Sequence, residues 1–256
     1  MRDVLIVGGA AMGWATAHHL LRLDAGQNVA VVEKDPSLRY ASTTLSDGNV
    51  RVQFNLEENI AISLYAMECL ENFADLAVDD FVPDPKMRKQ GNLFLVEEAG
   101  QVDAMAGLAA QHRLGCDTRW LDLDEIAARH PALTSEHLIG GTLGPRDGSV
   151  DPGAVVDAYR RNARHGGADL LAGTIESLLL GDGKIEGARL SDGSLIQADT
   201  VVVCAGAWSA QLLATAGAEI PVDPVMRTIY VVAGDVPGTE GMPSIFLPSG
   251  VYVLPE

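Results

Sequence analysis

The sequence has few cysteines, and their arrangement excludes the usual cysteine-based sites. The three that it contains, Cys69, Cys116 and Cys204, are odd in number and lie far apart. That spacing suits neither a zinc site nor a redox pair, so we expect no metal. Free thiols are typical of a reducing compartment, and we therefore expect a cytoplasmic protein.

Positive charge is also scarce. Lys and Arg together number 18 against 35 Asp and Glu, which gives a net charge of -17 at pH 7. This balance argues against nucleic acid or an anionic membrane as a partner. An anionic substrate would need a local positive group to offset the negative field of the whole chain.

No stretch of the sequence has the pattern of a membrane span or a signal peptide. The most apolar stretch, residues 4–23, is interrupted by glycines and by His18 and His19, and Asp3 precedes it. We find no internal repeat and no low-complexity segment. With 256 residues and 47% apolar content, the chain can form one or two domains with a good core.

The first 33 residues carry the clearest pattern. A continuous apolar run at 4–7, typical of a strand buried on both faces, leads into the glycine-rich turn 8–13. A helical pattern follows over 14–21, and a second apolar run at 29–32 ends in Glu33. This order predicts a dinucleotide-binding unit in which the turn faces a pyrophosphate and the acid binds ribose hydroxyls. The acid favours FAD or NAD over NADP.

One position departs from the G-x-G-x-x-G pattern. Ala10 occupies the place of the second glycine, whose absent side chain lets the backbone approach the pyrophosphate. Either a small shift of the backbone accommodates the extra methyl group, or the methyl group weakens binding of the pyrophosphate. A nucleotide-binding unit and a unit that has lost its ligand therefore both remain open.

Beyond residue 165 the sequence predicts a series of strands. Hairpin signals at 181–183 and 192–193 separate short apolar runs, which indicates a β-meander. The runs lie around Leu170 and at 175–180, 185–190 and 195–198. A further buried strand is expected at 201–204, and another strand at 228–232.

Five elements in order resemble one family. They are 41–46 (Ala-Ser-Thr-Thr-Leu-Ser), 50–54, 147–152 (Asp-Gly-Ser-Val-Asp-Pro), 205–209 (Ala-Gly-Ala-Trp-Ser) and 250–252 (Gly-Val-Tyr). Together with the first unit they are similar to the FAD-dependent amine and amino-acid oxidoreductases, which include D-amino-acid oxidase, glycine oxidase and sarcosine oxidase. The resemblance covers essentially the whole chain.

The resemblance implies an α/β fold with two domains. A Rossmann-like FAD-binding domain would consist of the discontinuous segments 1–81 and 142–218. A mainly antiparallel β substrate domain would consist of 82–141 and 219–256. Members of this family continue further, so the substrate domain is expected to be incomplete at its C-terminus. A second chain or self-association would then complete the fold.

The resemblance also implies which residues bind FAD. The turn would carry the pyrophosphate, Glu33 the adenosine ribose, the hydroxyl-rich loop the ribityl chain and ring, and Ile175 the adenine. Where some relatives attach FAD through a histidine, this loop reads Thr44-Leu45-Ser46, so we expect non-covalent FAD. The expected cofactor contacts are Gly8, Gly9, Ala10, Met12, Gly13, Glu33, Lys34, Ser42, Thr43, Thr44, Ser46, Asn49, Ile175, Ala205, Gly206 and Trp208.

The implied chemistry is oxidation of the C–N bond of a small amine or amino acid, by hydride transfer to flavin N5 and hydrolysis of the imine. Such a site needs a cation for a substrate carboxylate, and a guanidinium fork matches a carboxylate. Arg51 is the first candidate, with Tyr252 and Arg227 as further ones. For Arg51, a structural ion pair with one of the many acids is the alternative.

Two other functions remain open. The chain can be a non-catalytic or partner-completed nucleotide-binding subunit of the same fold, in which case the isolated chain is inactive. The first unit alone would also suit an NAD-dependent dehydrogenase, although the meander and the segment 205–209 do not. Purified protein that stays colourless after addition of FAD would favour the non-catalytic subunit.

Overall fold

The computed structural model describes residues 1–131, 133, 137–234, 239 and 241–255. The chain forms two compact units, each made of three segments of the sequence. Unit 1 comprises Met1–Ser46, Ala74–Asp84 and Pro152–Ile229, and unit 2 comprises Asp47–Phe73, Pro85–Asp151 and Tyr230–Glu256.

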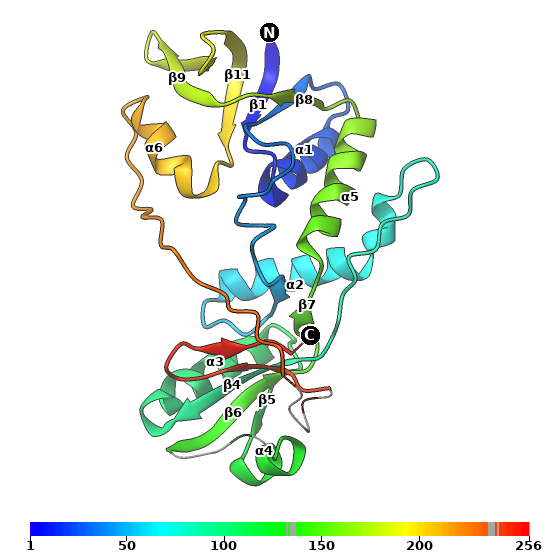
Figure 1. Ribbon diagram of the computed structural model, residues 1–256, viewed down its shortest axis with the longest axis vertical. Coiled ribbons are helices and arrows are strands. Elements are labelled where there is room, and N and C mark those ends of the chain that lie inside the picture. Colours follow the sequence, from blue (N-terminus) through cyan, green and yellow to red (C-terminus); the bar gives the residue numbers. More distant parts are fainter. Residues whose placement is uncertain (132, 134–136, 235–238, 240, 256) are drawn as a thin grey trace. The chain divides into compact units, whose positions relative to one another are not determined.

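Unit 1 is built on a six-stranded sheet with the order β8-β2-β1-β11-β10-β9 (Figure 1). Strands β8, β2, β1 and β11 are parallel, whereas β9 and β10 continue the sheet as antiparallel strands. The strands are β1 (Arg2–Val7), β2 (Val29–Glu33), β8 (Asp169–Ala172), β9 (Ile175–Gly181), β10 (Lys184–Leu190) and β11 (Leu195–Val203). The predicted glycine-turn unit and the meander are therefore parts of one sheet, and β9, β10 and β11 form the meander. The expectation that the strand around Leu170 belongs to the meander was wrong, because β8 pairs with β2 in parallel at the opposite edge.

Strand β11 joins the two parts of that sheet. Residues 195–197 pair with β10 in antiparallel register, and residues 198–203 pair with β1 in parallel register. The expectation of two strands, at 195–198 and 201–204, was wrong because a single nine-residue strand, Leu195–Val203, makes both pairings. The strand needs no break, since its two ends simply have different neighbours.

Helices cover both faces of the unit 1 sheet. Helices α1 (Ala11–Leu23) and α5 (Pro152–His165) lie side by side on one face, where Trp14 and Val156 pack with Ile6 (Figure 1). On the other face, Leu212 of the short helix α6 (Ser209–Ala214) packs with Leu5. Burial on both faces explains why β1 and β2 are continuous apolar runs rather than alternating ones.

Unit 2 is built on a five-stranded sheet with the order β13-β12-β4-β6-β5. All neighbours are antiparallel except β12 and β4, so the expected mainly antiparallel sheet is confirmed. The strands are β4 (Asn92–Glu97), β5 (Arg119–Leu121), β6 (Leu138–Gly144), β12 (Ser244–Phe246) and β13 (Tyr252–Val253). A separate ribbon pairs β3 (Asn49–Val50) with β7 (Gly148–Ser149).

The helices of unit 2 are α2 (Glu57–Glu71), α3 (Gln101–Arg113) and α4 (Leu123–Arg129), among the residues that the structure describes. Short 3-10 turns lie at Glu98–Gly100 in unit 2 and at Gly206–Trp208 in unit 1. A further one, Phe73–Leu76, begins at the last residue of a unit 2 segment and continues into unit 1. Unit 2 contains α2 and residues 142–151, which the sequence had assigned to the FAD-binding domain. The division of the chain into a FAD-binding and a substrate domain stays a prediction.

The expected strand at 228–232 does not form. Within the described residues this segment has no strand partner, and Tyr230, Val231 and Val232 are 82%, 91% and 84% exposed. Its β-branched and aromatic residues favour a strand, but that preference needs neighbours to pack against. A strand pattern in the sequence therefore did not suffice here.

None of the helices among the described residues is both long and apolar enough to cross a membrane. The same residues contain no group of three or more His, Cys, Asp or Glu side chains placed to hold a metal ion. The cysteines Cys69, Cys116 and Cys204 are free.

Candidate functional site

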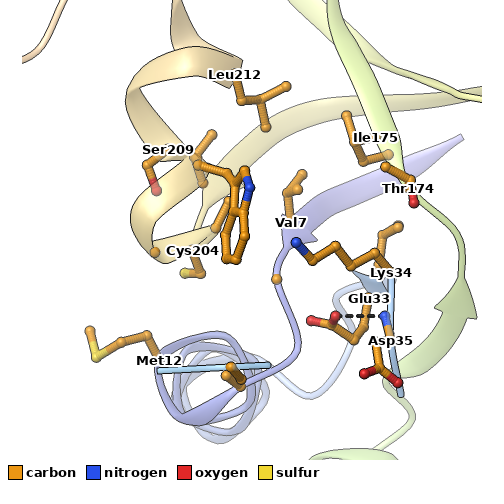
Figure 2. Close-up of a pocket in the computed structure, with 18 of the residues that line it drawn as sticks. Val7, Met12, Glu33, Lys34, Asp35, Thr174, Ile175, Cys204, Ser209 and Leu212 are labelled. Atoms are coloured by element: carbon orange, nitrogen blue, oxygen red, sulfur yellow. Dashed lines mark hydrogen bonds between the residues drawn. The ribbon is translucent and has the colours of Figure 1, made fainter. Parts of the chain in front are cut away.

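A cavity of about 950 Å³ lies at the carboxyl ends of the parallel strands of unit 1 (Figure 2). Its wall includes Gly8 after β1, Glu33 and Lys34 at the end of β2, Thr174 after β8, and Cys204 after β11. The chain runs from β1 through α1 to β2 on one side, while β11 lies on the other side of β1. Ligands of open α/β sheets bind at such a switch point.

Two glycines make the close packing of the turn after β1 feasible. Gly8 has a φ of +108°, and a Cβ on it would lie 2.3 Å from the carbonyl oxygen of Cys204. A Cβ on Gly13 would lie 1.8 Å from the carbonyl oxygen of Gly8. Gly13 does not line the cavity, so its function is to let α1 pack against the turn.

The N-terminus of α1 is available for an anion. The first amides of a helix have no acceptor within it, and here the first turn contains no acidic residue. Ala10, which precedes α1, makes no capping hydrogen bond through its side chain. Ala10 and Met12 both line the cavity. The free amides and the helix dipole together suit a phosphate group.

The methyl group of Ala10 is accommodated without strain. Ala10 has a φ of -87°, which any L-residue adopts, and its side chain packs against the core that contains Trp14. We therefore expect Ala10→Gly to lower the free energy of unfolding by about 0.5–1 kcal/mol, because glycine adds flexibility. FAD affinity, measured by calorimetric titration, should change by less than about tenfold. A larger gain in affinity would mean that the methyl group obstructs the ligand.

Glu33 holds the turn together from the end of β2. Its Oε2 accepts a hydrogen bond of 2.7 Å from the amide of Gly9. Its Oε1 accepts one of 2.8 Å from the amide of Asp35, which Figure 2 shows as a dashed line. A carboxylate has about four acceptor positions, so both oxygens can still accept bonds from hydroxyl groups. The geometry thus fits the expected contact with a ribose.

Lys34 and Trp208 meet across the same cavity. The Nζ atom of Lys34 lies 3.2 Å from the centre of the Trp208 ring, a cation–π contact. Ile175 lines the cavity beside Thr174 (Figure 2). Open space surrounds Gly206, since a Cβ there would meet no atom within 4 Å. The wall therefore combines an aromatic ring, aliphatic groups and bare backbone, which suits a flat ring system.

The structure brings most of the expected cofactor contacts together. The cavity is lined by Gly8, Ala10, Met12, Glu33, Lys34, Ser42, Thr43, Ile175, Ala205, Gly206 and Trp208. Five others do not line it: Gly9, Gly13, Thr44, Ser46 and Asn49.

The hydroxyls of two of those five residues stabilise the loop that carries them. Thr44 Oγ1 donates to the carbonyls of Leu38 and Ala41, at 2.5 and 3.1 Å, and Ser46 Oγ donates to that of Thr43 at 2.9 Å. The sequence identified a hydroxyl-rich loop, but it could not separate hydroxyls that shape the loop from those on the wall.

Asn49 belongs to unit 2, where its side-chain amide exchanges hydrogen bonds of 2.9 and 3.0 Å with that of Asn92. Sequence reasoning missed Cys204, Gln211 and Thr215 on the wall of the unit 1 cavity. Burial raises the pKa of Cys204, whose side chain also forms a hydrogen bond with Thr16.

A second cavity, of about 480 Å³, lies within unit 2. Arg51 and Tyr252, two of the three expected catalytic residues, both line it although they are far apart in the sequence. The remaining wall residues are mostly apolar or small: Asp47, Asn49, Val50, Phe54, Ser63, Ala66, Met67, Leu70 and Phe246. The third candidate, Arg227, is exposed and lines neither cavity.

Arg51 is half-buried among aromatic rings. Its guanidinium carbon lies 4.9, 5.2 and 5.7 Å from the ring centres of Phe54, Phe94 and Phe246. No carboxylate in the described part of the chain forms an ion pair with it, so the structural ion pair considered above is not found there. Burial lowers the pKa of Arg51, and the charges of Asp147 and Asp47 partly offset this effect.

Asp147 is fully buried directly behind this wall. Its Oδ1 accepts a 3.0 Å hydrogen bond from the amide of Val52, and its Oδ2 accepts one of 2.9 Å from Gln53 Nε2. Burial is the main cause that raises the pKa of Asp147 to about 6, while these two hydrogen bonds and Arg51 act in the opposite direction. The sequence analysis named Asp147 only as part of the element 147–152, since nothing local reveals partners so distant in the chain.

Comparison with known proteins gives a consistent result. Residues 3–256 match the family described as FAD dependent oxidoreductase. The chain is 27% identical over 290 residues to "FAD-dependent oxidoreductase domain-containing protein 1" of Xenopus laevis, covering 99% of this chain and 58% of that protein. The chain thus spans somewhat more than half the length of this relative.

Solved structures share the fold. Glycine oxidase from Geobacillus kaustophilus superimposes with a TM-score of 0.79 at 23% identity, covering 100% of this chain and 68% of that one. L-proline dehydrogenase from P. horikoshii superimposes with a TM-score of 0.78 at 23% identity, covering 98% of this chain and 66% of that one. The expected α/β fold, with a Rossmann-like part and a mainly antiparallel part, is therefore confirmed.

Proposed function

Because the chain belongs to the family of FAD-dependent oxidoreductases and FAD is the cofactor of that family, we propose that it oxidises the C–N bond of an amino acid or secondary amine. The cavity of unit 1 would hold the dinucleotide without a covalent bond. The cavity of unit 2 would hold the substrate. The observation that carries this proposal is a guanidinium without an acidic partner in an aromatic cavity.

FAD supplies the redox step when it is bound, by accepting a hydride from the substrate carbon that carries the nitrogen. The residues of unit 1 bind and orient it. The amides at the start of α1 would neutralise the diphosphate, and Glu33 would accept hydrogen bonds from the ribose. Lys34 and Trp208 would enclose the flat part of the nucleotide.

Unit 2 would select and orient the substrate. Arg51 would bind a carboxylate through its planar fork, which offers two parallel hydrogen bonds. Arg51 is half-buried among the rings of Phe54, Phe94 and Phe246, so its interaction with a carboxylate would be stronger than that of an exposed arginine. An apolar environment also disfavours an ammonium ion, so the substrate nitrogen stays neutral. The carbon attached to a neutral amine nitrogen can then give up a hydride. Water then hydrolyses the resulting imine.

Visible spectroscopy tests this function. We expect the purified protein to show a flavin spectrum, or to acquire one when FAD is added. Under anaerobic conditions, an amine or amino acid that is a substrate should bleach that spectrum. A panel of glycine, N-methylglycine, proline, D-amino acids and simple amines without a carboxylate would rank the substrates. A flavin that no member of the panel reduces would contradict the proposal.

A non-catalytic or partner-completed subunit is the second candidate, and one observation favours it. In the described residues, the segment 225–232 is mostly apolar and has no strand partner, with Met226 91% exposed and Tyr230 82% exposed. Exposed apolar surface of this kind favours association with a second chain or a second copy. Protein that stays colourless in the presence of FAD would support the non-catalytic alternative, and a second chain that restores bleaching would support the partner-completed one.

A further inference from the structure

The surroundings of Arg51 point to a residue that controls it without touching the substrate. Arg51 is followed by Val52 and Gln53, and both of these residues donate a hydrogen bond to Asp147, at 3.0 and 2.9 Å. Val52 is 4% exposed and Gln53 8% exposed, so water does not compete for these bonds. One buried carboxylate therefore holds the main-chain amide of Val52 and the side-chain amide of Gln53.

Asp147 is itself held in place from several directions. Its amide donates to the carbonyl of Gly144 at 3.2 Å, and its carbonyl accepts from the amide of Gly91 at 2.9 Å. A Cβ on Gly144 would lie 2.4 Å from Asp147 Oδ2, so glycine is required beside the carboxylate. Gln53 Nε2 also donates to the carbonyl of Asn92 at 2.9 Å, which ties the cluster to β4.

We propose that Asp147 is a positioning residue for Arg51, because it anchors the two residues that follow and sets the net charge beside the guanidinium. This inference deepens the proposed function, on which it rests. The anchor keeps the guanidinium against the aromatic wall of the unit 2 cavity, where a carboxylate would bind. The anchor favours binding of a carboxylate, whereas the negative charge of an ionised Asp147 opposes it, because it repels an incoming anion.

The charged and titratable groups around Asp147 are few. Arg51 lies on one side, while Asp117 and the thiol of Cys116 face it from the loop between α3 and β5. Asp47 acts on Arg51 from the wall of the unit 2 cavity. Burial raises the pKa of Asp147 to about 6, so its charge changes in the mildly acidic range.

The direction of the pH effect follows from linkage. An anion bound at Arg51 makes ionisation of Asp147 less favourable, so Asp147 takes up a proton more readily when the anion is bound. By reciprocity, the anion binds more tightly when Asp147 is protonated. Affinity for a carboxylate should therefore fall as the pH rises through about 6.

Calorimetry on the FAD-loaded chain tests this inference with propionate as the probe and propionamide as its uncharged counterpart. In the wild type, propionate affinity should fall roughly threefold to tenfold from about pH 5.5 to about pH 7.5, and propionamide affinity should not change. In Asp147→Asn the fall should disappear. The Asn amide oxygen can still accept from the Val52 amide, and its NH2 group can donate to Gln53 Oε1 after the Gln53 amide rotates, which breaks the bond from Gln53 Nε2 to the Asn92 carbonyl. Asp103→Asn removes an exposed charge of α3 and should keep the wild-type profile.

A second readout does not depend on FAD or on binding. In Asp147→Ala the amide of Val52 loses its acceptor, so its hydrogen exchange should become at least about tenfold faster than in the wild type. If that variant does not fold, the Asp147→Asn profile still decides the outcome.

An unchanged pH profile in Asp147→Asn, or unchanged exchange at Val52 in Asp147→Ala, would overturn the inference. The failure of the proposed function looks different: wild-type protein would then bind propionate no better than propionamide at any pH. In that case the exchange of Val52 still decides whether Asp147 anchors this segment.

Discussion

Gly13→Ala is expected to destabilise the protein and to weaken FAD binding. The new Cβ would lie 1.8 Å from the carbonyl oxygen of Gly8 and 3.5 Å from Ile6 Cγ2, and neither α1 nor β1 can move away in a packed core. We expect the free energy of unfolding of the FAD-free chain to fall by about 3 kcal/mol, the upper part of the range for overpacking. FAD affinity should fall at least about tenfold, because the turn that faces the diphosphate must open.

Gly100→Ala is the matched control for this substitution. A Cβ on Gly100 would meet only Val96 Cγ1, at 3.7 Å, which is an ordinary contact. Chemical denaturation and FAD titration should therefore give nearly wild-type values. Normal FAD affinity and stability in Gly13→Ala would show that the turn is looser than the geometry indicates.

Arg51→Gln is expected to raise KM for a carboxylate-containing substrate by roughly 10- to 100-fold, while FAD content stays at the wild-type level. Hydrogen bonds to a charged group contribute about 1.5–3 kcal/mol, and glutamine retains only one weaker donor group. The substitution leaves the cavity of unit 1 untouched, since Arg51 does not line it. Steady-state kinetics and the flavin spectrum of the same sample check the two halves of this prediction.

The specificity of the Arg51 effect has an internal control. Arg113 lies on α3 of the same unit, is exposed, and pairs with Glu57 at 2.7 Å. Arg113→Gln removes the same charge from unit 2 without reaching the cavity, so KM should not change. An amine without a carboxylate should also be insensitive to Arg51→Gln. Equal KM values for wild type and Arg51→Gln would remove Arg51 from the substrate site.

The sequence predicted the local part of the unit 1 site well. The apolar runs, the glycines and Glu33 lie within 33 residues, and each follows a rule of local geometry: buried strands lack polar residues, and tight turns require glycine. The structure confirms the strand, turn, helix and second strand. It also explains Ala10, whose φ of -87° does not need glycine.

The sequence was less informative wherever a partner lies far along the chain. The segment 228–232 has the composition of a strand, but pairing depends on a neighbour that composition does not identify. Asp147 was named only as part of the element 147–152, because its partners Val52 and Gln53 lie 95 and 94 residues away. Arg51 and Tyr252 were named through the family resemblance, and no spacing rule would have placed them on the same cavity.

The central claim is that the start of α1 and the adjoining strand ends hold the diphosphate of FAD. Amide hydrogen exchange, compared between the FAD-free and the FAD-saturated chain, tests it most directly. We predict that FAD slows exchange at the amides of Ala11 and Met12, whose hydrogens have no acceptor within the helix, and at Ile175 on the opposite wall. Saturable FAD binding that leaves the exchange of these amides unchanged would contradict the claim.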